Sequence, residues 1–305
     1  MAHTQLILIS GFLGSGKTTL LHNLFTLYAD RRIAVIVNEF GKRGVDGAVL
    51  AESGVHVEEI SNGSIFCVCR SDLFLDTLVQ ALQTKVDIVL VETSGLSDPT
   101  GMAQILHQVT EHAGESYDFY GTICVAESAR LLKLIGNVPA IKQQIVSAGM
   151  VLLNKMDVSA PETVAETTAL INELNPHAEI YQTTNAFVER AWLDKLPAAQ
   201  KLVKGGITRN TLGVKSLLVQ VENRPAYALF QQWLAAISPE VYRIKGFVTL
   251  AEGVFLADCA GPQVALRKAA GEGSYVVILT GGGDKTVKLL AEAHQRILGT
   301  EIVFE

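Results

Sequence analysis

The sequence predicts an α/β fold with a mostly parallel sheet, followed by a smaller α+β domain. From residue 5 to about 200, short β-rich apolar runs alternate with longer segments of helical periodicity, as in consecutive βα units. The runs 88–91 and 150–153 are apolar at every position. Such continuous runs are expected where helices cover both faces of a sheet, so we predict that both are central strands.

The elements of the first region follow one another in alternation. The expected strands cover 5–10, 33–38, 55–60, 87–92, 119–125, 150–154 and 179–182. The expected helices cover 17–29, 71–84, 99–113, 138–148, 161–175 and 188–196. Pro161 suits the first turn of its helix, and Ser159 is the candidate residue to cap it.

The pattern changes after Pro197, where glycines and the run 210–213 interrupt regular structure. We place a linker there and predict two domains, covering residues 1–205 and 214–305. The second domain is expected to contain a short extended piece between its third and fourth strands. Its strands are expected over 215–222, 241–251, 253–260, 275–280 and 301–304, and its helices over 225–237 and 284–298.

Composition and charge narrow the class of protein. A chain of 305 residues is long enough for two domains with a buried core. No apolar run approaches the roughly 20 residues that cross a bilayer, and the N-terminus lacks the pattern of a secretory signal, so we expect a cytoplasmic protein. The net charge of -6 argues against nucleic acid as a partner. The four cysteines do not resemble a disulfide framework for this length and are expected to be reduced.

The stretch 11–19 fits the phosphate-binding motif G-x-x-x-x-G-K-[ST], with an apolar run before it and a helical pattern after it. Glycines let the backbone turn so that its N–H groups face inward, and the helix N-terminus adds partial positive charge. We expect Lys17 to reach the β- and γ-phosphates of a nucleoside triphosphate and Thr18 to bind Mg²⁺. The predicted phosphate-binding residues are Gly11, Gly14, Ser15, Gly16, Lys17, Thr18 and Thr19.

A second signal, Asn154–Asp157, directly follows the apolar run 150–153. The carboxylate of Asp157 can accept both the N1–H and the exocyclic N2–H₂ of guanine, a charge-assisted pair that adenine does not offer. Asn154 is expected to brace the loop, and Lys155 to lie along the base. The segment 183–185 follows a later strand and is a candidate to complete the base pocket. The predicted nucleotide is therefore GTP.

A third signal is Glu92 at the carboxyl end of the strand 87–92. Ligands collect outside the carboxyl ends of strands in open α/β sheets, so Glu92 is expected to face Mg²⁺ in the same crevice as the phosphate-binding loop. Gly95 is expected to sense the γ-phosphate, which would make 93–101 a switch segment. Lys17 and Glu92 are the predicted catalytic residues, whereas Asp87 begins the strand and is assigned a structural role.

A fourth signal is Glu39 together with Cys67 and Cys69. Two thiolates and a carboxylate suit Zn²⁺ or a neighbouring transition ion such as Co²⁺. The alternative is that these cysteines are simply buried thiols. Cys124 and Cys259 fall in apolar strands and are expected to belong to the core.

These motifs together resemble the CobW-type family of P-loop GTPases, relatives of the urease and hydrogenase nickel-insertion GTPases. The resemblance implies a metallochaperone-like or cobalamin-synthesis-protein-like GTPase, whose hydrolysis is coupled to delivering a transition metal or to maintaining a metalloenzyme or corrinoid system. Residues 224–225 and 245–248 resemble the family's small appended C-terminal domain. The segments that carry the resemblance are GFLGSGKTT, VNEFG, NGSIFCVC, ETSGLSDP and LLNKMD.

The sequence departs from the family's C-x-C-C motif. Ser64 and Phe66 stand at the positions of its first two cysteines, Cys67 matches the third, and Cys69 lies beyond the motif. A hydroxyl and a phenyl ring cannot replace thiolates. Lys42 stands where family members often carry an acid, and it would repel a nearby cation.

Three functions are compatible with these residues. In the first, GTP and Mg²⁺ order the loops, and hydrolysis changes the geometry of a transition-metal site. In the second, a guanine-nucleotide switch binds or remodels a protein client, such as a metalloenzyme or corrinoid-related enzyme, without carrying a metal. The third, a small-molecule kinase, is disfavoured by the guanine-reading motif. No residue is evident to position the attacking water, so we expect it from a partner or from a second protomer in a nucleotide-dependent dimer.

Overall fold

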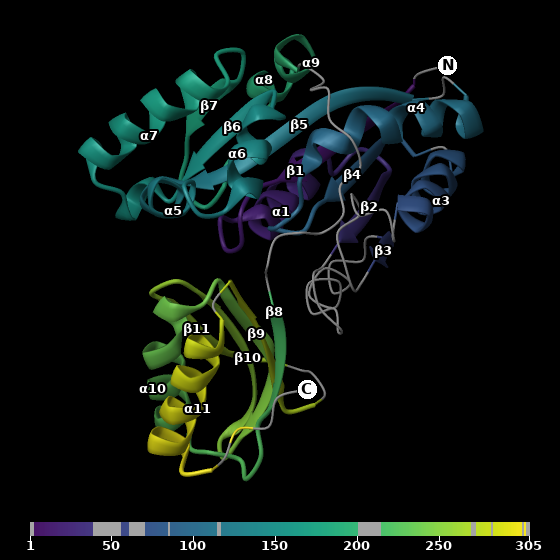
Figure 1. The fold of residues 1–305 in the computed structure, drawn as a ribbon. Helices are drawn as coiled ribbons and strands as arrows, with labels where there is room; N and C mark the ends of the chain where they lie inside the picture. The colour runs from purple at the N-terminus through teal and green to yellow at the C-terminus, as the bar shows by residue number, and fades with distance from the viewer. Residues whose placement is uncertain are drawn as a thin grey trace. The chain divides into compact units, whose positions relative to one another are not determined.

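The computed structural model describes residues 3–38, 56–60, 71–84, 86–114, 117–200, 215–269, 273–281, 283–300 and 302. The chain divides into two compact units, Met1–Thr211 and Leu212–Glu305 (Figure 1). Assignment of the second unit to the family's appended domain stays a prediction.

The first unit contains a seven-stranded sheet in the order β3-β2-β4-β1-β5-β6-β7. Every neighbouring pair is parallel, which confirms the predicted sheet type. Because β1 lies between β4 and β5, the loops that follow these three strands meet at one edge. The strands are β1 (Thr4–Ser10), β2 (Ile33–Asn38), β3 (His56–Ile60), β4 (Ile88–Glu92), β5 (Tyr117–Glu127), β6 (Met150–Asn154) and β7 (Glu179–Gln182).

Helices connect these strands and differ from the predictions at three places. The helix expected over 99–113 begins with a 3₁₀ turn, Pro99–Gly101, and the one expected over 188–196 is two short helices. α5 was not predicted, because no glycine or proline separates it from β5. The helices are α1 (Lys17–Leu27), α3 (Ser71–Gln83), α4 (Met102–Ala113), α5 (Ser128–Leu134), α6 (Pro139–Val146), α7 (Pro161–Leu174), α8 (Arg190–Leu193) and α9 (Leu196–Ala199).

The expected cap of α7 is wrong. Pro161 does begin the helix, but the capping position is Ala160, which makes no side-chain cap. The Ser159 hydroxyl instead donates to the Lys155 carbonyl oxygen at 2.7 Å. Ser159 therefore stabilises the turn that follows β6 rather than the helix.

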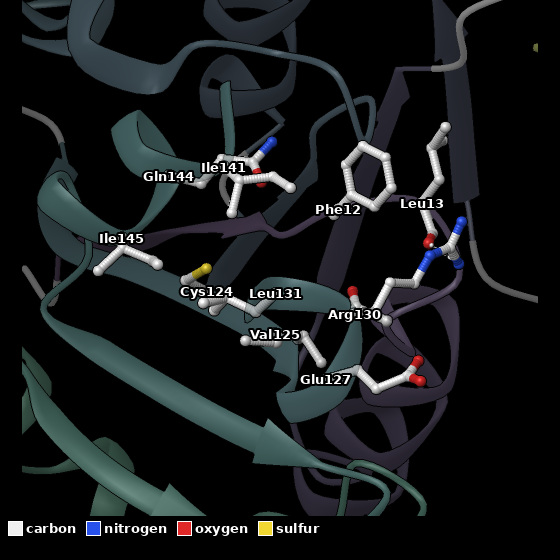
Figure 2. Close-up of a pocket in the computed structure, with 12 residues that line it drawn as sticks. Phe12, Leu13, Cys124, Val125, Glu127, Arg130, Leu131, Ile141, Gln144 and Ile145 are labelled. Carbon is white, nitrogen blue, oxygen red and sulfur yellow. Dashed lines mark hydrogen bonds between the residues drawn. The ribbon is translucent and has the colours of Figure 1, made fainter. Parts of the chain in front are cut away.

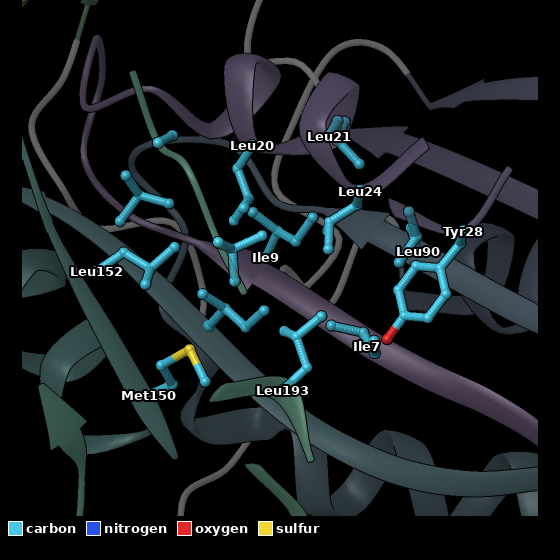
Figure 3. Close-up of a cluster of buried hydrophobic side chains, with 14 of the residues drawn as sticks. Ile7, Ile9, Leu20, Leu21, Leu24, Tyr28, Leu90, Met150, Leu152 and Leu193 are labelled. Atoms are coloured by element: carbon cyan, nitrogen blue, oxygen red, sulfur yellow. The ribbon is translucent and has the colours of Figure 1, made fainter. Parts of the chain in front are cut away.

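Two apolar clusters explain why the central strands are apolar at every position. Ile7 and Ile9 of β1 pack in a cluster with buried leucines of α1 (Figure 3). Their neighbours Leu6 and Leu8 point to the opposite face and pack with residues of α3 and α4. Burying one such side chain stabilises the fold by about 1.5–3 kcal/mol. Both clusters hold β1 and the first also holds α1, so the two elements that flank the phosphate-binding loop are fixed in place.

The second unit is an antiparallel five-stranded sheet in the order β11-β10-β9-β12-β8. Its helices pack on the sheet around the fully buried Trp233 and Phe230. The predicted order is confirmed, with the short extended piece as β11, while the strand expected over 301–304 falls largely outside the described residues. The elements are β8 (Lys215–Gln220), α10 (Tyr227–Ile237), the 3₁₀ turn Ser238–Glu240, β9 (Arg243–Leu250), β10 (Gly253–Ala260), β11 (Gln263–Lys268), β12 (Tyr275–Thr280) and α11 (Asp284–Leu298).

No helix in the described part of the chain is both long and apolar enough to cross a membrane.

Candidate functional site

The loop between β1 and α1 depends on glycine at both ends. Gly11 has φ +134° and Gly16 has φ +116°, conformations that residues with a side chain rarely adopt. A Cβ at Gly11 would lie 2.2 Å from the Val125 carbonyl oxygen of β5, and one at Gly16 would lie 2.4 Å from Nδ2 of Asn154. The loop therefore turns tightly against both β5 and the residue that ends β6.

The Lys17 ammonium is held inside this loop. Lys17 begins α1 and is only 5% exposed. Its Nζ donates to the carbonyl oxygens of Gly11 at 2.9 Å and of Phe12 at 3.3 Å. A buried cation needs such partners, and these bonds fix its position. The loop thus concentrates positive charge at the N-terminus of α1, where an anion would be stabilised. The other predicted phosphate residues, Gly14, Ser15 and Thr19, lie in the same loop or in the first turn of α1.

Thr18 and Glu92 meet at the carboxyl edge of the sheet. Glu92 ends β4 and is 5% exposed, and its two carboxylate oxygens each lie 3.4 Å from Oγ1 of Thr18. These contacts are longer than an ordinary hydroxyl–carboxylate hydrogen bond. A hydroxyl and a carboxylate form the all-oxygen donor set that Mg²⁺ prefers, so the two residues fit this ion.

Gly95 lies directly against the phosphate-binding loop. A Cβ on Gly95 would come within 2.6 Å of the Leu13 backbone nitrogen. The segment is also tied to β1, because the Thr93 N–H donates to the Ile9 carbonyl oxygen at 2.9 Å. Glycine is thus needed for the segment after β4 to approach Leu13 so closely.

Asn154 joins the phosphate-binding loop to the segment after β7. It is 2% exposed. Its Nδ2 donates to the Ser15 carbonyl oxygen at 2.8 Å, and its Oδ1 accepts from the Ala186 N–H at 2.8 Å. Nδ2 of Asn23 on α1 adds bonds to the carbonyl oxygens of Asn185 at 2.9 Å and Ala186 at 2.8 Å. One buried amide therefore connects the residues expected to bind phosphate with those expected to surround the base.

Lys155 and Asp157 follow Asn154 in a turn of unusual conformation. Lys155 adopts a left-handed backbone, with φ +63°. Its Nζ lies 2.6 Å from Oε2 of Glu127, which ends β5. Asp157 is exposed on the following 3₁₀ turn, Met156–Val158. The Asp157 carboxylate is consequently accessible to a ligand, while the Lys155 ammonium is held by Glu127.

Residues 5–182 match the model of the CobW/HypB/UreG family, described as a nucleotide-binding domain. The chain belongs to this family. The resemblance inferred from the sequence motifs is thereby confirmed.

This CobW/HypB/UreG chain is similar in sequence to several proteins and in fold to solved structures. Zinc chaperone YeiR of Escherichia coli is 39% identical over 166 residues, which cover 52% of this chain and 49% of that protein. Zinc-regulated GTPase metalloprotein activator 1 of Dictyostelium discoideum is 27% identical over 216 residues, which cover 59% of this chain and 46% of that protein. The chain thus spans about half the length of these relatives. The crystal structure of Zn(II)-bound YjiA GTPase from E. coli covers 97% of this chain and 99% of its own, with a TM-score of 0.47 and 18% identity.

The predicted transition-metal residues of this family member, Glu39, Cys67 and Cys69, lie outside the described residues, as do Lys42, Ser64 and Phe66. Within the described ranges, no group of three or more His, Cys, Asp or Glu side chains is placed to hold a metal ion.

The remaining cysteines belong to the core, as predicted. Cys124 and Cys259 are free and buried. Burial raises the pKa of each thiol to about 12. A thiol must lose its proton to act as a metal ligand or nucleophile, so both are inert at neutral pH.

Asp87 has the structural role expected of it. Its carboxylate accepts from Nη2 of Arg32 at 3.1 Å and from the Arg32 backbone N–H at 2.9 Å. The bonds from Arg32 lower the pKa of Asp87 to about 2. Asp87 therefore ties the end of the loop before β2 to the start of β4, away from the nucleotide-binding edge.

Arg130 and Gln144 also adjoin the site, although sequence motifs did not indicate them. Nη1 of Arg130 donates to the Leu13 carbonyl oxygen at 2.8 Å, and its Cζ lies 5.1 Å from the centre of the Phe12 ring. Arg130 and Gln144 both line a small pocket next to the phosphate-binding loop (Figure 2). The cavity has a volume of about 20 Å³. That volume is enough for about one water molecule. Arg130 lies on α5, which was not predicted, so no sequence signal placed it here.

Proposed function

We propose that this chain binds and hydrolyses GTP with Mg²⁺ and couples its nucleotide state to transition-metal delivery or to maturation of a metalloenzyme or corrinoid system. The observation that carries the proposal is the double hydrogen bond of Asn154. These two bonds connect the loop expected to bind phosphate with the segment expected to surround the base, which supports a single nucleotide site. The family's description as a nucleotide-binding domain supports the same conclusion.

The phosphate end of the site supports a hydrolytic role. Lys17, held by two loop carbonyls, would neutralise charge on the β- and γ-phosphates. Thr18 and Glu92 would hold Mg²⁺, which supplies further charge neutralisation when bound. The Gly95 N–H would donate to the γ-phosphate and thereby distinguish GTP from GDP.

The base end supports guanine selectivity. Exposed Asp157 would accept two hydrogen bonds from the guanine edge, and the stem of Lys155 would lie along the ring while its ammonium stays paired with Glu127. The segment 183–187, held by Asn154 and Asn23, would close the pocket.

The metal part of the proposal rests on the relatives. One is named a zinc chaperone and another a zinc-regulated GTPase metalloprotein activator, so we propose Zn²⁺ as the cargo, with Co²⁺ as an alternative. Glu39, Cys67 and Cys69 are the proposed ligands. A protein client, a nucleotide-dependent dimer and a cytoplasmic location belong to the same proposal.

A second function is favoured by one specific feature. Ser64 and Phe66 replace two expected thiols, which favours a guanine-nucleotide switch that acts on a protein client without carrying a metal itself.

Cobalt binding separates the two functions. We expect reduced protein to bind one Co²⁺ with thiolate charge-transfer absorption, and the affinity to differ about tenfold between GDP and a non-hydrolysable GTP analogue. Cys67→Ser should abolish the absorption, whereas Cys259→Ser, a control for a buried core thiol, should retain it. Absence of stoichiometric binding in both nucleotide states would remove the metal-carrying function and leave the second one.

A further inference from the structure

We propose that Gln144 is a positioning residue for GTP hydrolysis, which holds the segment after β4 in the geometry that lets Gly95 engage the γ-phosphate. This inference rests on the proposed function and assigns that site a residue from outside its motifs. Gln144 lies on α6 and is 1% exposed. Its Nε2 donates to the carbonyl oxygens of Gly95 at 3.1 Å and of Ser97 at 3.0 Å.

The two bonds fix the backbone around Gly95 from one side. A side-chain amide has two N–H donors, and Nε2 of Gln144 contacts two carbonyls that lie two residues apart. The Gly95 N–H and carbonyl belong to adjacent peptide groups that rotate about the bonds to its Cα, and glycine leaves these rotations unusually free. Holding the Gly95 and Ser97 carbonyl oxygens fixes the backbone that continues from Gly95 and so narrows the range over which its N–H can turn. Gln144 therefore limits the orientations that the Gly95 N–H can adopt.

The phosphate-binding loop fixes Gly95 from the other side. The Leu13 backbone nitrogen is so close that a Cβ on Gly95 would lie 2.6 Å from it. Leu13 is itself held by Nη1 of Arg130, at 2.8 Å from its carbonyl oxygen. Gly95 is thus located between a loop held by α5 and a side chain of α6. Figure 2 shows Leu13 beside Arg130, with Gln144 across the pocket from them.

This arrangement has a chemical consequence that differs between the two nucleotides. Donors that are oriented in advance need no reorganisation when charge develops on the transferred phosphoryl group. GDP has no γ-phosphate, so the orientation of Gly95 should scarcely affect its binding. Replacing a residue that merely stabilised the fold would instead weaken the binding of GTP and GDP alike.

The test is Gln144→Met, which keeps the size of the side chain and removes both donors. We expect kcat for GTP hydrolysis to fall about ten- to hundredfold. The affinity for GDP should change by less than about threefold. The affinity for a non-hydrolysable GTP analogue should fall more, so the preference for the analogue over GDP should fall about tenfold. Gln144→Asn keeps the amide but is one methylene too short to reach both carbonyls. Its kcat and nucleotide preference should lie between those of Gln144→Met and the wild type, and it replaces Gln144→Met as the test if that variant does not fold.

Asn175→Ala is the matched control. Asn175 is also a buried amide, but its Nδ2 donates to the carbonyl oxygens of Ile145, near the end of α6, and of Ala148, just beyond it, both at 2.8 Å, rather than to the segment after β4. It should lower the melting temperature without changing kcat or the nucleotide preference. Unchanged kcat and preference in Gln144→Met, or equal losses in Asn175→Ala, would overturn the inference while the wild type still hydrolyses GTP. A wild-type protein that hydrolyses no GTP would contradict the proposed function itself.

Discussion

Replacing Asn154 with alanine is expected to lower the free energy of unfolding by about 3 kcal/mol and to abolish tight GDP binding. The change leaves the Ser15 carbonyl oxygen and the Ala186 N–H without the partner that each has at 2.8 Å. Each buried group that loses its partner costs about 1–3 kcal/mol. The loss should also uncouple the phosphate-binding loop from the base loop. Urea unfolding and calorimetric titration with GDP measure the two effects.

Two further variants divide the effect of Asn154. Asn154→Asp keeps an acceptor for the Ala186 N–H but places a carboxylate oxygen against the Ser15 carbonyl, so phosphate binding should suffer while the base loop stays in place. Asn175→Ala removes another buried amide from the same unit and should lower stability with little effect on GDP affinity. Wild-type GDP affinity in Asn154→Ala would disprove the bridging role of this residue.

Replacing Asp157 with asparagine is expected to weaken GTP binding by about a hundredfold or more and to favour xanthine nucleotides. The carboxylate accepts both guanine N–H groups, whereas an amide presents one donor and one acceptor and can pair with the xanthine edge. Asp157 is exposed on its 3₁₀ turn, so the change should leave the fold intact. Competition between GDP, xanthosine diphosphate and ADP for the purified variant measures the preference.

Glu162→Gln provides the control for charge. Glu162 is an exposed acid in the first turn of the nearby helix α7, and its replacement makes the same change in net charge. Its base preference should equal that of the wild type. If Asp157→Asn also retains the wild-type preference, the base pocket has been assigned to the wrong residues.

Local sequence patterns were sufficient to predict the strands of the parallel sheet and to find the main motifs. The run before Gly11 and the run before Asn154 are continuous and apolar, and each ends at a residue whose chemistry is recognisable from spacing alone. The parallel sheet then brings these residues together, since β1 and β6 lie on either side of β5 and the loops after parallel strands meet at one edge.

The parts that sequence reasoning missed depend on contacts between distant residues. Gln144 lies 49 positions from Gly95, and Arg130 lies 117 from Leu13. Nothing in the residues around them marks these contacts, because they depend on how α5 and α6 pack against the edge of the sheet. The prediction of one helix over 188–196 was wrong for a local reason. It is divided into α8 and α9, where Pro197 favours a new first turn.

Phosphate release by the wild-type protein tests most directly whether this site is a guanine-nucleotide hydrolase. The rate is measured with GTP and with ATP, each in the presence of Mg²⁺ or of a chelator, and again for Lys17→Ala purified in the same way. We expect release from GTP that requires both Mg²⁺ and Lys17, with ATP at least about a hundredfold slower. Equal rates with ATP, or release from GTP that persists in Lys17→Ala, would contradict the assignment.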